Sequence, residues 1–285
     1  MNGNDRLLLE DEIEQIRANI RKQFPAVQWP EPVMEPVFYG RLKKKPVLDR
    51  FAMLDINTGN VFDIVSGKYN LVTHEEVVHD LLSSVPAEFG RTETEIKLYD
   101  AGAKIRVDVT FPDIPEHVGE IKPGDKVDAR VSAYSSYNRS TFHGVLTGAK
   151  QLVCSNGLVA FRSEEKKRRH INGSTITREQ LTEEISVFLT DFAKTTDLWR
   201  TWANRRLEKL ELDEVMVALP FSEPERDRIM ELPLMNNNGR MLKQLEHITL
   251  WDVSSAATQF AKHEVRGEQR SMDLEQQIAV VLHTV

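Results

Sequence analysis

Alternating hydrophobic and polar positions dominate the first 160 residues of the chain. In the run 127–133, four hydrophobic residues at odd positions alternate with three polar residues at even positions. A period of two residues is typical of a half-buried β-strand. The segments 93–99 and 104–111 show the same alternation, and the short segment Asp100–Ala103 lies between them. The pattern therefore predicts antiparallel hairpins in this part of the chain.

Further segments of the same region are also predicted strands. They cover residues 37–42, 51–56, 61–65 and 141–150. The polar residues 135–140 predict the turn between the central strand 127–133 and the strand 141–150. Asn156 and Gly157 form the strongest short turn signal in the chain, because both residues tolerate positive φ. Together these segments predict a β-meander that ends in a tight turn.

Hydrophobic residues three and four positions apart predict helices before, within and after the strand region. Residues 7–24 form one amphipathic pattern of this kind. A capping box at 73–76 predicts the start of a short helix that ends near Leu82. A second capping box at 177–180 opens the longest helical pattern, whose hydrophobic stripe continues to Leu207.

The remaining C-terminal sequence is predicted to be helical. The helical segments are 213–218, 225–232, 241–247, 249–263 and 272–282. Trp199, Trp202 and Trp251 lie on hydrophobic stripes of these patterns, so we expect them in the core. Strands with one short helix, followed by a long helix and a helical C-terminal part, predict the α+β class rather than a doubly wound sheet.

The order of elements divides the chain into three parts. Residues 1–36 are expected to be a helical arm with a proline-rich connector, because four prolines between positions 25 and 36 favour an extended, stiff segment. Residues 37–175 are expected to be an antiparallel β-rich core. Residues 176–285 are expected to be a helical part packed on that core. The arm at 7–24 can bury its hydrophobic stripe on its own domain or on a second copy, and we therefore predict a homo-oligomer.

Composition places the chain among ordinary globular proteins. It has 285 residues, of which 40% are hydrophobic and 28% charged. No hydrophobic run approaches the roughly 18 residues that a membrane span requires, and the first residues lack the pattern of a signal peptide. The single cysteine fits a reducing cytoplasm. We therefore expect a cytoplasmic protein without a membrane partner.

The sequence contains no recognisable catalytic or metal-binding motif. Cys154 lies among hydrophobic neighbours, which is typical of a small buried side chain rather than a nucleophile. His74 and His79 are five residues apart, so on a helix their rings point in different directions and do not match a zinc motif. The segment 144–151 lacks the spacing of a phosphate-binding loop. We expect a protein that is not an enzyme and has no cofactor and no metal.

One short motif resembles a known family. The sequence Leu-Val-Cys-Ser-Asn-Gly-Leu at 152–158, which follows a polar-turn hairpin, is similar to the hallmark of a phage- and plasmid-encoded family known only as a domain of unknown function. A second similarity runs from Thr249 to His263. The resemblance implies a bacterial host cell and a remote relationship to single-strand annealing recombinases. Within the motif, Cys154, Asn156 and Gly157 are expected to have structural roles, because Cys154 has hydrophobic neighbours and the turn needs residues that tolerate positive φ.

Basic residues are the remaining functional signal in a chain whose net charge is −7. A positively charged groove can bind the phosphates of a single strand, and exposed aromatic rings can stack on its bases. Tyr134 and Tyr137 flank the predicted central turn and are the candidate stacking residues. The candidate phosphate-binding residues are Lys43, Lys44, Lys45, Arg50, Arg139, Lys150, Arg162, Lys166, Lys167, Arg168 and Arg169.

Three functions remain open from the sequence. The first is a non-enzymatic protein that binds single-stranded DNA and assists annealing in a phage or plasmid recombination system. The second is a structural or protein-interaction protein of a mobile element, without affinity for nucleic acid. The third is an enzyme whose site is assembled from residues distant in sequence. The family resemblance, together with the basic residues, favours the first.

Overall fold

The computed structural model describes residues 3–40, 45–113, 116–141, 144–151, 157–159, 178–234 and 247–284. Its helices are α1 Gly3–Gln23, α2 His74–Ser84, α3 Glu116–Gly119, α4 Arg178–Asn204, α5 Lys209–Ala218, α6 Glu223–Leu234, α7 Leu250–His263 and α8 Glu268–Thr284. Its strands are β1 Pro32–Tyr39, β2 Lys45–Asp55, β3 Val61–Val65, β4 Glu93–Tyr99, β5 Lys104–Phe111, β6 Glu120–Lys122, β7 Asp125–Ser136, β8 Gly144–Gln151 and β9 Gly157–Val159. The predicted α+β class is confirmed.

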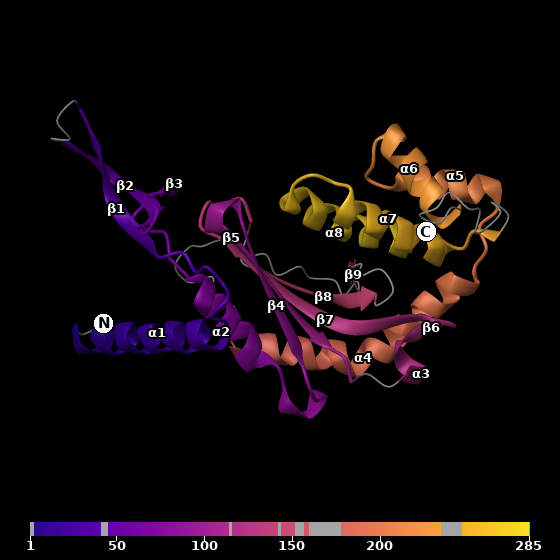
Figure 1. The fold of residues 1–285 in the computed structure, drawn as a ribbon, viewed down its shortest axis with the longest axis horizontal. Helices are drawn as coiled ribbons and strands as arrows, with labels where there is room; N and C mark the ends of the chain where they lie inside the picture. The colour runs from indigo at the N-terminus through magenta and orange to yellow at the C-terminus, as the bar shows by residue number, and fades with distance from the viewer. Residues whose placement is uncertain are drawn as a thin grey trace.

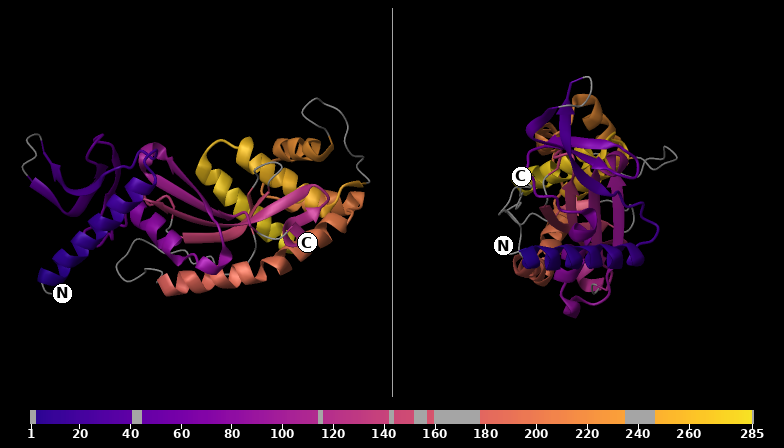
Figure 2. Two further views of the ribbon diagram at one scale, coloured as in Figure 1. Left: turned by 60° about the horizontal axis from the view of Figure 1, so that its bottom comes forward. Right: turned by 90° about the vertical axis from the view of Figure 1, so that its left-hand side faces the viewer.

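Two antiparallel sheets form the β part of the described residues. The larger sheet has six strands in the order β4-β5-β7-β8-β9, with β6 paired to β7, and the smaller sheet has the order β1-β2-β3. In Figure 1 the small sheet and α1 lie at one end of the molecule, and α5 and α6 lie at the other. The long helix α4 runs below the large sheet, while α7 and α8 lie above it (Figures 1 and 2).

One face of the large sheet is hydrophobic and forms the main core. Ile105, Val107, Val109 and the matching residues of β7 are at most 2% exposed. They belong to one buried cluster with α2 and α4 residues such as Val77 and Phe188. The strand predictions for 93–99 and 104–111 are confirmed to the residue, because period-two alternation identifies a strand directly. The predicted core positions of Trp199, Trp202 and Trp251 are also confirmed.

The polar face of the large sheet differs from the sequence expectation. Alternation predicted a half-buried central strand, with its polar positions toward solvent. Instead Arg106, Asp108, Arg130 and Ser132 are at most 7% exposed, and Arg106 reaches Glu275 of α8. The prediction of one solvated face is therefore wrong for β5 and β7, because a helix from the end of the chain covers it.

Several other boundaries also differ from the predictions. The proline-rich connector was expected to extend to residue 36, but β1 already begins at Pro32. An edge strand can contain prolines, because its outer positions need no N–H group for pairing. The segment 112–124, which lies between two predicted strands, contains α3 and β6. The capping box at 73–76 is confirmed, with Thr73 and Glu76 bonding each other's backbone N–H groups. The predicted helix 241–247 and the capping residue Thr177 lie outside the described residues, apart from His247.

Charged side chains fix the C-terminal half of α1 to the body and to the base of the small sheet. Arg21 donates to Glu75 Oε1 of α2 at 2.6 Å and to Glu31 Oε2 at 2.9 Å. Arg17 also bonds Glu31, which immediately precedes β1. Burial alone raises the pKa of Glu31, but the hydrogen bonds from Arg17 and Arg21 outweigh it and lower this pKa. This end of the predicted arm is therefore packed on its own chain.

Candidate nucleic-acid interface

The distal part of the small sheet is a two-stranded ribbon. β3 pairs with β2 over Phe51–Leu54, close to the base of the sheet. Beyond this point the register pairs Phe38 with Pro46 and Tyr39 with Lys45. Among the described residues, no third strand continues alongside these pairs. Figure 1 shows this ribbon projecting from the body, so both of its faces are open.

Aromatic and basic side chains of this ribbon are exposed. Phe38 is 48% exposed and Tyr39 is 56% exposed. Because successive strand residues point to opposite faces, each face of the ribbon carries one aromatic ring. Lys45 and Arg50 on β2 are exposed as well. Near the ribbon tip Tyr39 pairs with Lys45, so both rings lie close to an exposed cation.

A bulge in β2 bends the ribbon and presents Leu48. The register passes from Pro36↔Phe51 to Phe38↔Pro46, so β2 has three more residues than β1 between these pairs. Asp49 within the bulge has a φ of 53°, and its Oδ1 accepts a hydrogen bond of 2.9 Å from the backbone N–H of Gly67. Leu48 is consequently 87% exposed.

Many of the predicted site residues lie outside the described residues. These are Lys43, Lys44, Cys154, Asn156, Arg162, Lys166, Lys167, Arg168 and Arg169. Gly157 is described as the first residue of β9, where it pairs with Lys150 of β8. Lys45 and Arg50 are both exposed on β2. The prediction that all the basic residues line a single groove stays a prediction.

Tyr134 and Tyr137 are not the exposed rings that the sequence suggested. Tyr134 is 3% exposed, and it covers Gly144 of β8, where an added Cβ would lie 2.7 Å from Tyr134 Oη. Tyr137 is fully buried, accepts a 2.8 Å hydrogen bond from His74 N and stacks on the His74 ring at 4.0 Å. The expectation of exposed stacking rings is therefore wrong for both positions. Both rings are instead part of the packing around the central strand.

Arg139 and Lys150 are separated from the ribbon tip. Arg139 forms two hydrogen bonds with Asp63 of β3, at 2.5 and 3.0 Å. These bonds lower the pKa of Asp63 against the opposing effect of burial. Lys150 is half-buried on β8, directly opposite Asp128 of β7. Arg139 and Lys150 therefore each have a carboxylate nearby. The cations of the ribbon are more exposed than these two and more accessible to a polyanion.

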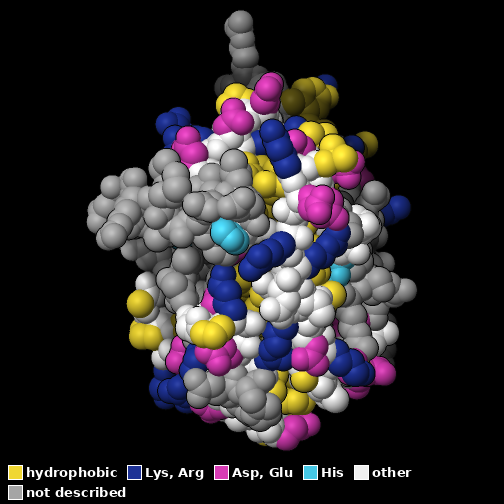
Figure 3. Space-filling view, turned by 90° about the vertical axis from the view of Figure 1, so that its right-hand side faces the viewer, with side chains coloured by type: hydrophobic (Ala, Val, Ile, Leu, Met, Phe, Trp, Pro, Cys, Tyr) yellow, Lys and Arg dark blue, Asp and Glu magenta, His cyan; other side chains and the backbone are white. Residues whose placement is uncertain are grey.

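The opposite end of the molecule carries cations of a different kind. Figure 3 shows Lys and Arg side chains near the middle of that face, with Asp and Glu side chains close to them. Several cations of this end are paired: Lys122 with Asp252 at 3.1 Å, and Arg200 with Asp197 at 2.5 Å. Paired cations of this kind offer less attraction to a polyanion than the ribbon does.

A buried ionic cluster lies between the large sheet and α8. Asp108 Oδ1 is 3.0 Å from Arg106 Nε and accepts a 2.5 Å hydrogen bond from Ser132 Oγ. Glu275 Oε2 lies 3.5 Å from Arg106 Nη2 and 3.6 Å from Arg130 Nη2. Burial raises the pKa of Asp108, but the two guanidinium groups outweigh it and hold this pKa at about 2. The cluster joins strands and helix, and the sequence alone did not reveal it.

The remaining chemistry of the described residues is limited. Among them, no group of three or more His, Cys, Asp or Glu side chains is placed to hold a metal ion. Their helices include none that is long and apolar enough to cross a membrane. The ribbon is therefore the surface whose chemistry points most directly to a ligand. Sequence reasoning missed Phe38 and Tyr39, although they stand directly before the basic run 41–45.

Comparison with known proteins gives a family but no activity. A family model described as "Domain of unknown function (DUF932)" matches residues 61–282, which is most of the chain. Neither a curated protein nor a solved structure matches the sequence significantly.

Proposed function

This chain belongs to the family of the domain of unknown function DUF932, and from its exposed ribbon we propose that it binds single-stranded DNA without catalysing a reaction. The observation that carries the proposal is the combination of exposed Phe38 and Tyr39 with exposed Lys45 on one projecting hairpin. Single-strand binding proteins combine stacking rings with cations that follow the phosphates.

The charge of the sequence that contains the ribbon strands supports this proposal. The thirteen residues from Phe38 to Arg50 contain five basic residues and one acidic residue, a net charge of +4, whereas the whole chain carries −7. A polyanion is therefore attracted to this hairpin rather than to the protein as a whole. Lys and Arg neutralise phosphates irrespective of base sequence, so we expect little sequence preference from these contacts.

The two open faces of the ribbon favour single strands over duplex. In a duplex the base faces are stacked inside the helix, whereas unpaired bases can lie on an aromatic ring. A stacked base contributes about 1–3 kcal/mol for each ring. The two rings lie on opposite faces, so each can stack on one base. The two bases can belong to the same DNA strand or to two different segments of DNA.

The biological setting of this proposal rests on the family resemblance. We place the protein in annealing or recombination of a phage or plasmid, within the cytoplasm of a bacterial host. It is expected to act as a homo-oligomer through the N-terminal half of α1, which extends away from the sheets in Figures 1 and 2. Light scattering of the full chain at micromolar concentration checks this, and a monomer would contradict it.

A second candidate is a protein-interaction role without affinity for nucleic acid. The observation that favours it is Leu48, which is 87% exposed on the same ribbon as the rings. Exposed hydrophobic side chains that gather on one surface often mark a docking site for another protein.

Fluorescence anisotropy with labelled oligonucleotides decides between the two. A single strand and a duplex of the same sequence are titrated with the full chain at several salt concentrations. The DNA proposal predicts tighter binding of the single strand at every salt concentration, with affinity falling as salt rises. Absence of binding to either oligonucleotide at low salt would overturn it and favour the interaction role.

A further inference from the structure

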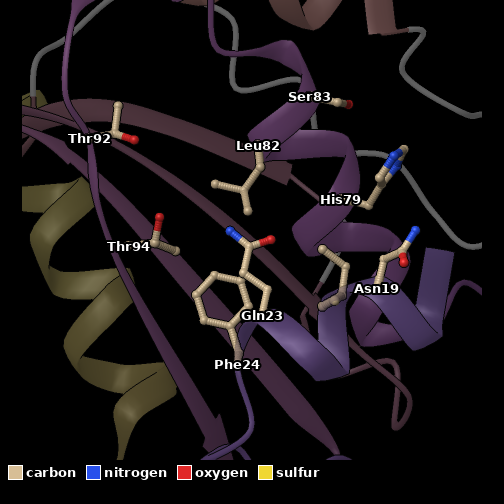
Figure 4. Close-up of a pocket in the computed structure, with 9 residues that line it drawn as sticks. Asn19, Gln23, Phe24, His79, Leu82, Ser83, Thr92 and Thr94 are labelled. Carbon is tan, nitrogen blue, oxygen red and sulfur yellow. The ribbon is translucent and has the colours of Figure 1, made fainter.

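A surface pocket lies where α1, α2 and the edge strand β4 meet. Its volume is about 700 Å³. Figure 4 shows Phe24 and Leu82 in the middle of the pocket, Thr92 and Thr94 on one side, and Asn19 and His79 on the other. The lining residues are Asn19, Ile20, Gln23, Phe24, His79, Leu82, Ser83, Thr92 and Thr94.

Six of the nine lining residues are polar, and one of these, His79, lies 3.5 Å from the carboxylate of Asp80. None of the nine lining residues is Asp, Glu, Lys or Arg, although these types make up 28% of the chain. The amides of Asn19 and Gln23 each offer a donor group and an acceptor group, and the hydroxyls of the lining can act in either way. A ligand with a mixed pattern of donors and acceptors, and no charge of its own, fits these groups.

The middle of the pocket supplies a surface for a flat apolar group. Ile20 is buried, while Phe24 and Leu82 are half-buried and pack against the main core. Ligand sites typically combine such apolar surface with a few orienting polar groups. An aromatic ring beside amide side chains is also how proteins recognise unpaired bases, by stacking and by hydrogen bonds to the base edge.

A basic side chain lies at the rim of the pocket. Arg178, at the start of α4, donates to the carbonyl oxygen of Ser83 from Nε at 3.0 Å and from Nη2 at 2.7 Å. Its guanidinium group is exposed. Through this contact with a lining residue, Arg178 is a described cation within reach of a phosphate carried by a ligand in the pocket.

We propose that this pocket holds one unpaired nucleobase, with the sugar and phosphate directed outward toward Arg178. The site is separate from the ribbon and involves none of its residues. The proposal goes beyond the binding of a DNA backbone, because it assigns a position at which the protein reads or holds a base.

Uncharged nucleosides, measured with the full chain and with the ring variant Phe38→Ala, Tyr39→Ala, test the pocket separately from both the phosphate contacts and the stacking rings of the ribbon. Without a phosphate they have no electrostatic attraction to the basic hairpin. Saturation-transfer NMR of the full chain with adenosine, guanosine, cytidine and thymidine should show transfer to base protons of at least one nucleoside. Glucose serves as a neutral ligand of comparable polarity, and we expect no transfer to it.

Variants of exposed lining residues locate the binding. The double variant Asn19→Ala, Gln23→Ala removes two amides that lie on the exposed side of α1, so it should fold normally. It should weaken nucleoside binding at least about tenfold, the effect of losing one to two hydrogen bonds. Thr94→Val removes a hydroxyl at nearly constant shape and should act in the same direction. Gln15→Ala, an exposed amide of α1 outside the pocket, should leave binding unchanged.

Three results would overturn the proposal: no transfer to any nucleoside, transfer that the folded double variant retains, or transfer to glucose that matches the nucleosides. A chain carrying Lys43→Ser, Lys44→Ser and Lys45→Ser should bind nucleosides like the parent. If that chain loses DNA but keeps nucleosides, both proposals stand. If the parent binds DNA but no nucleoside, only the pocket proposal falls.

Discussion

The substitution Glu275→Gln tests the role of the buried ionic cluster in joining α8 to the large sheet. Glu275 is 2% exposed, and its Oε2 is within 3.6 Å of guanidinium nitrogens of both Arg106 and Arg130. Glutamine keeps the shape of the side chain and removes its charge. Asp108 is then left as the partner carboxylate within 4.0 Å of both guanidinium groups.

The expected loss of stability follows from the unpaired charge. Removing one partner of a buried ion pair typically costs about 3–5 kcal/mol. Because the amide oxygen can still accept a hydrogen bond, we expect a loss near the lower limit, about 3 kcal/mol. In a chain of this size a loss of 1 kcal/mol lowers Tm by roughly 2–4 °C, so Tm should fall by roughly 6–12 °C.

Urea unfolding followed by tryptophan fluorescence measures this loss, because Trp199 and Trp251 are at most 1% exposed and report on the core. The matched control is Glu214→Gln, an exposed glutamate of α5, which should change the free energy of unfolding by no more than about 0.5 kcal/mol. If Glu275→Gln resembles the control, the cluster does not hold α8 on the sheet and the reasoning is wrong.

A second substitution separates the unpaired charge from lost packing. Adding Arg130→Met to Glu275→Gln removes the uncompensated guanidinium and leaves a side chain of similar length. If unpaired charge is the cause, the double variant should regain part of the stability that the single variant loses. If the double variant is simply less stable by the sum of both changes, packing is the cause instead.

Two further predictions concern the same sheet. The pKa of Asp108 is lowered from 3.8 to about 2. The ionised carboxylate therefore contributes about 2 kcal/mol to the free energy of unfolding. This contribution is present above pH 4 and is lost as the pH falls toward 2. Urea unfolding at several pH values should show a shallower acid dependence in Asp108→Asn than in the parent, and equal dependence would refute this. Gly144→Ala places a Cβ 2.7–3.1 Å from Oη, Cζ and Cε2 of the buried Tyr134 ring. This overlap should lower the free energy of unfolding by about 1–3 kcal/mol. An unchanged Tm would contradict the close approach of the ring to Gly144.

Local sequence patterns predicted the elements whose structure is determined by interactions between residues close in sequence. The strands 93–99 and 104–111 were predicted to the residue, since their alternation reflects one buried hydrophobic face. The capping box at Thr73 was predicted because both of its partners lie within one turn. In each case the residues that decide the element are neighbours in sequence.

Contacts between distant segments account for what the sequence did not reveal. The polar residues of β5 and β7 have the same alternation whether they meet water or a helix, and Glu275 is 169 residues from Arg106. Tyr137 lies next to a polar turn in the sequence, and this position suggested an exposed ring. In the structure it is buried against His74, which is 63 residues away. The exposure of Phe38 and Tyr39 depends on where β3 stops pairing with β2, which the periodicity of either strand does not indicate.

The salt dependence of DNA binding by a ribbon variant tests the central proposal most directly. Lys43→Ser, Lys44→Ser and Lys45→Ser together remove three charges from the sequence Phe38–Arg50, and Lys194→Ser, Arg206→Ser and Lys209→Ser remove three exposed charges elsewhere. For single strands the slope of log affinity against log salt is about 0.7 for each phosphate contacted. The ribbon variant should lose up to about 2 from this slope and bind every sequence more weakly, whereas the control should bind like the parent. If the two triple variants bind with equal affinity and equal slope, the ribbon does not contact DNA and the proposed function is wrong.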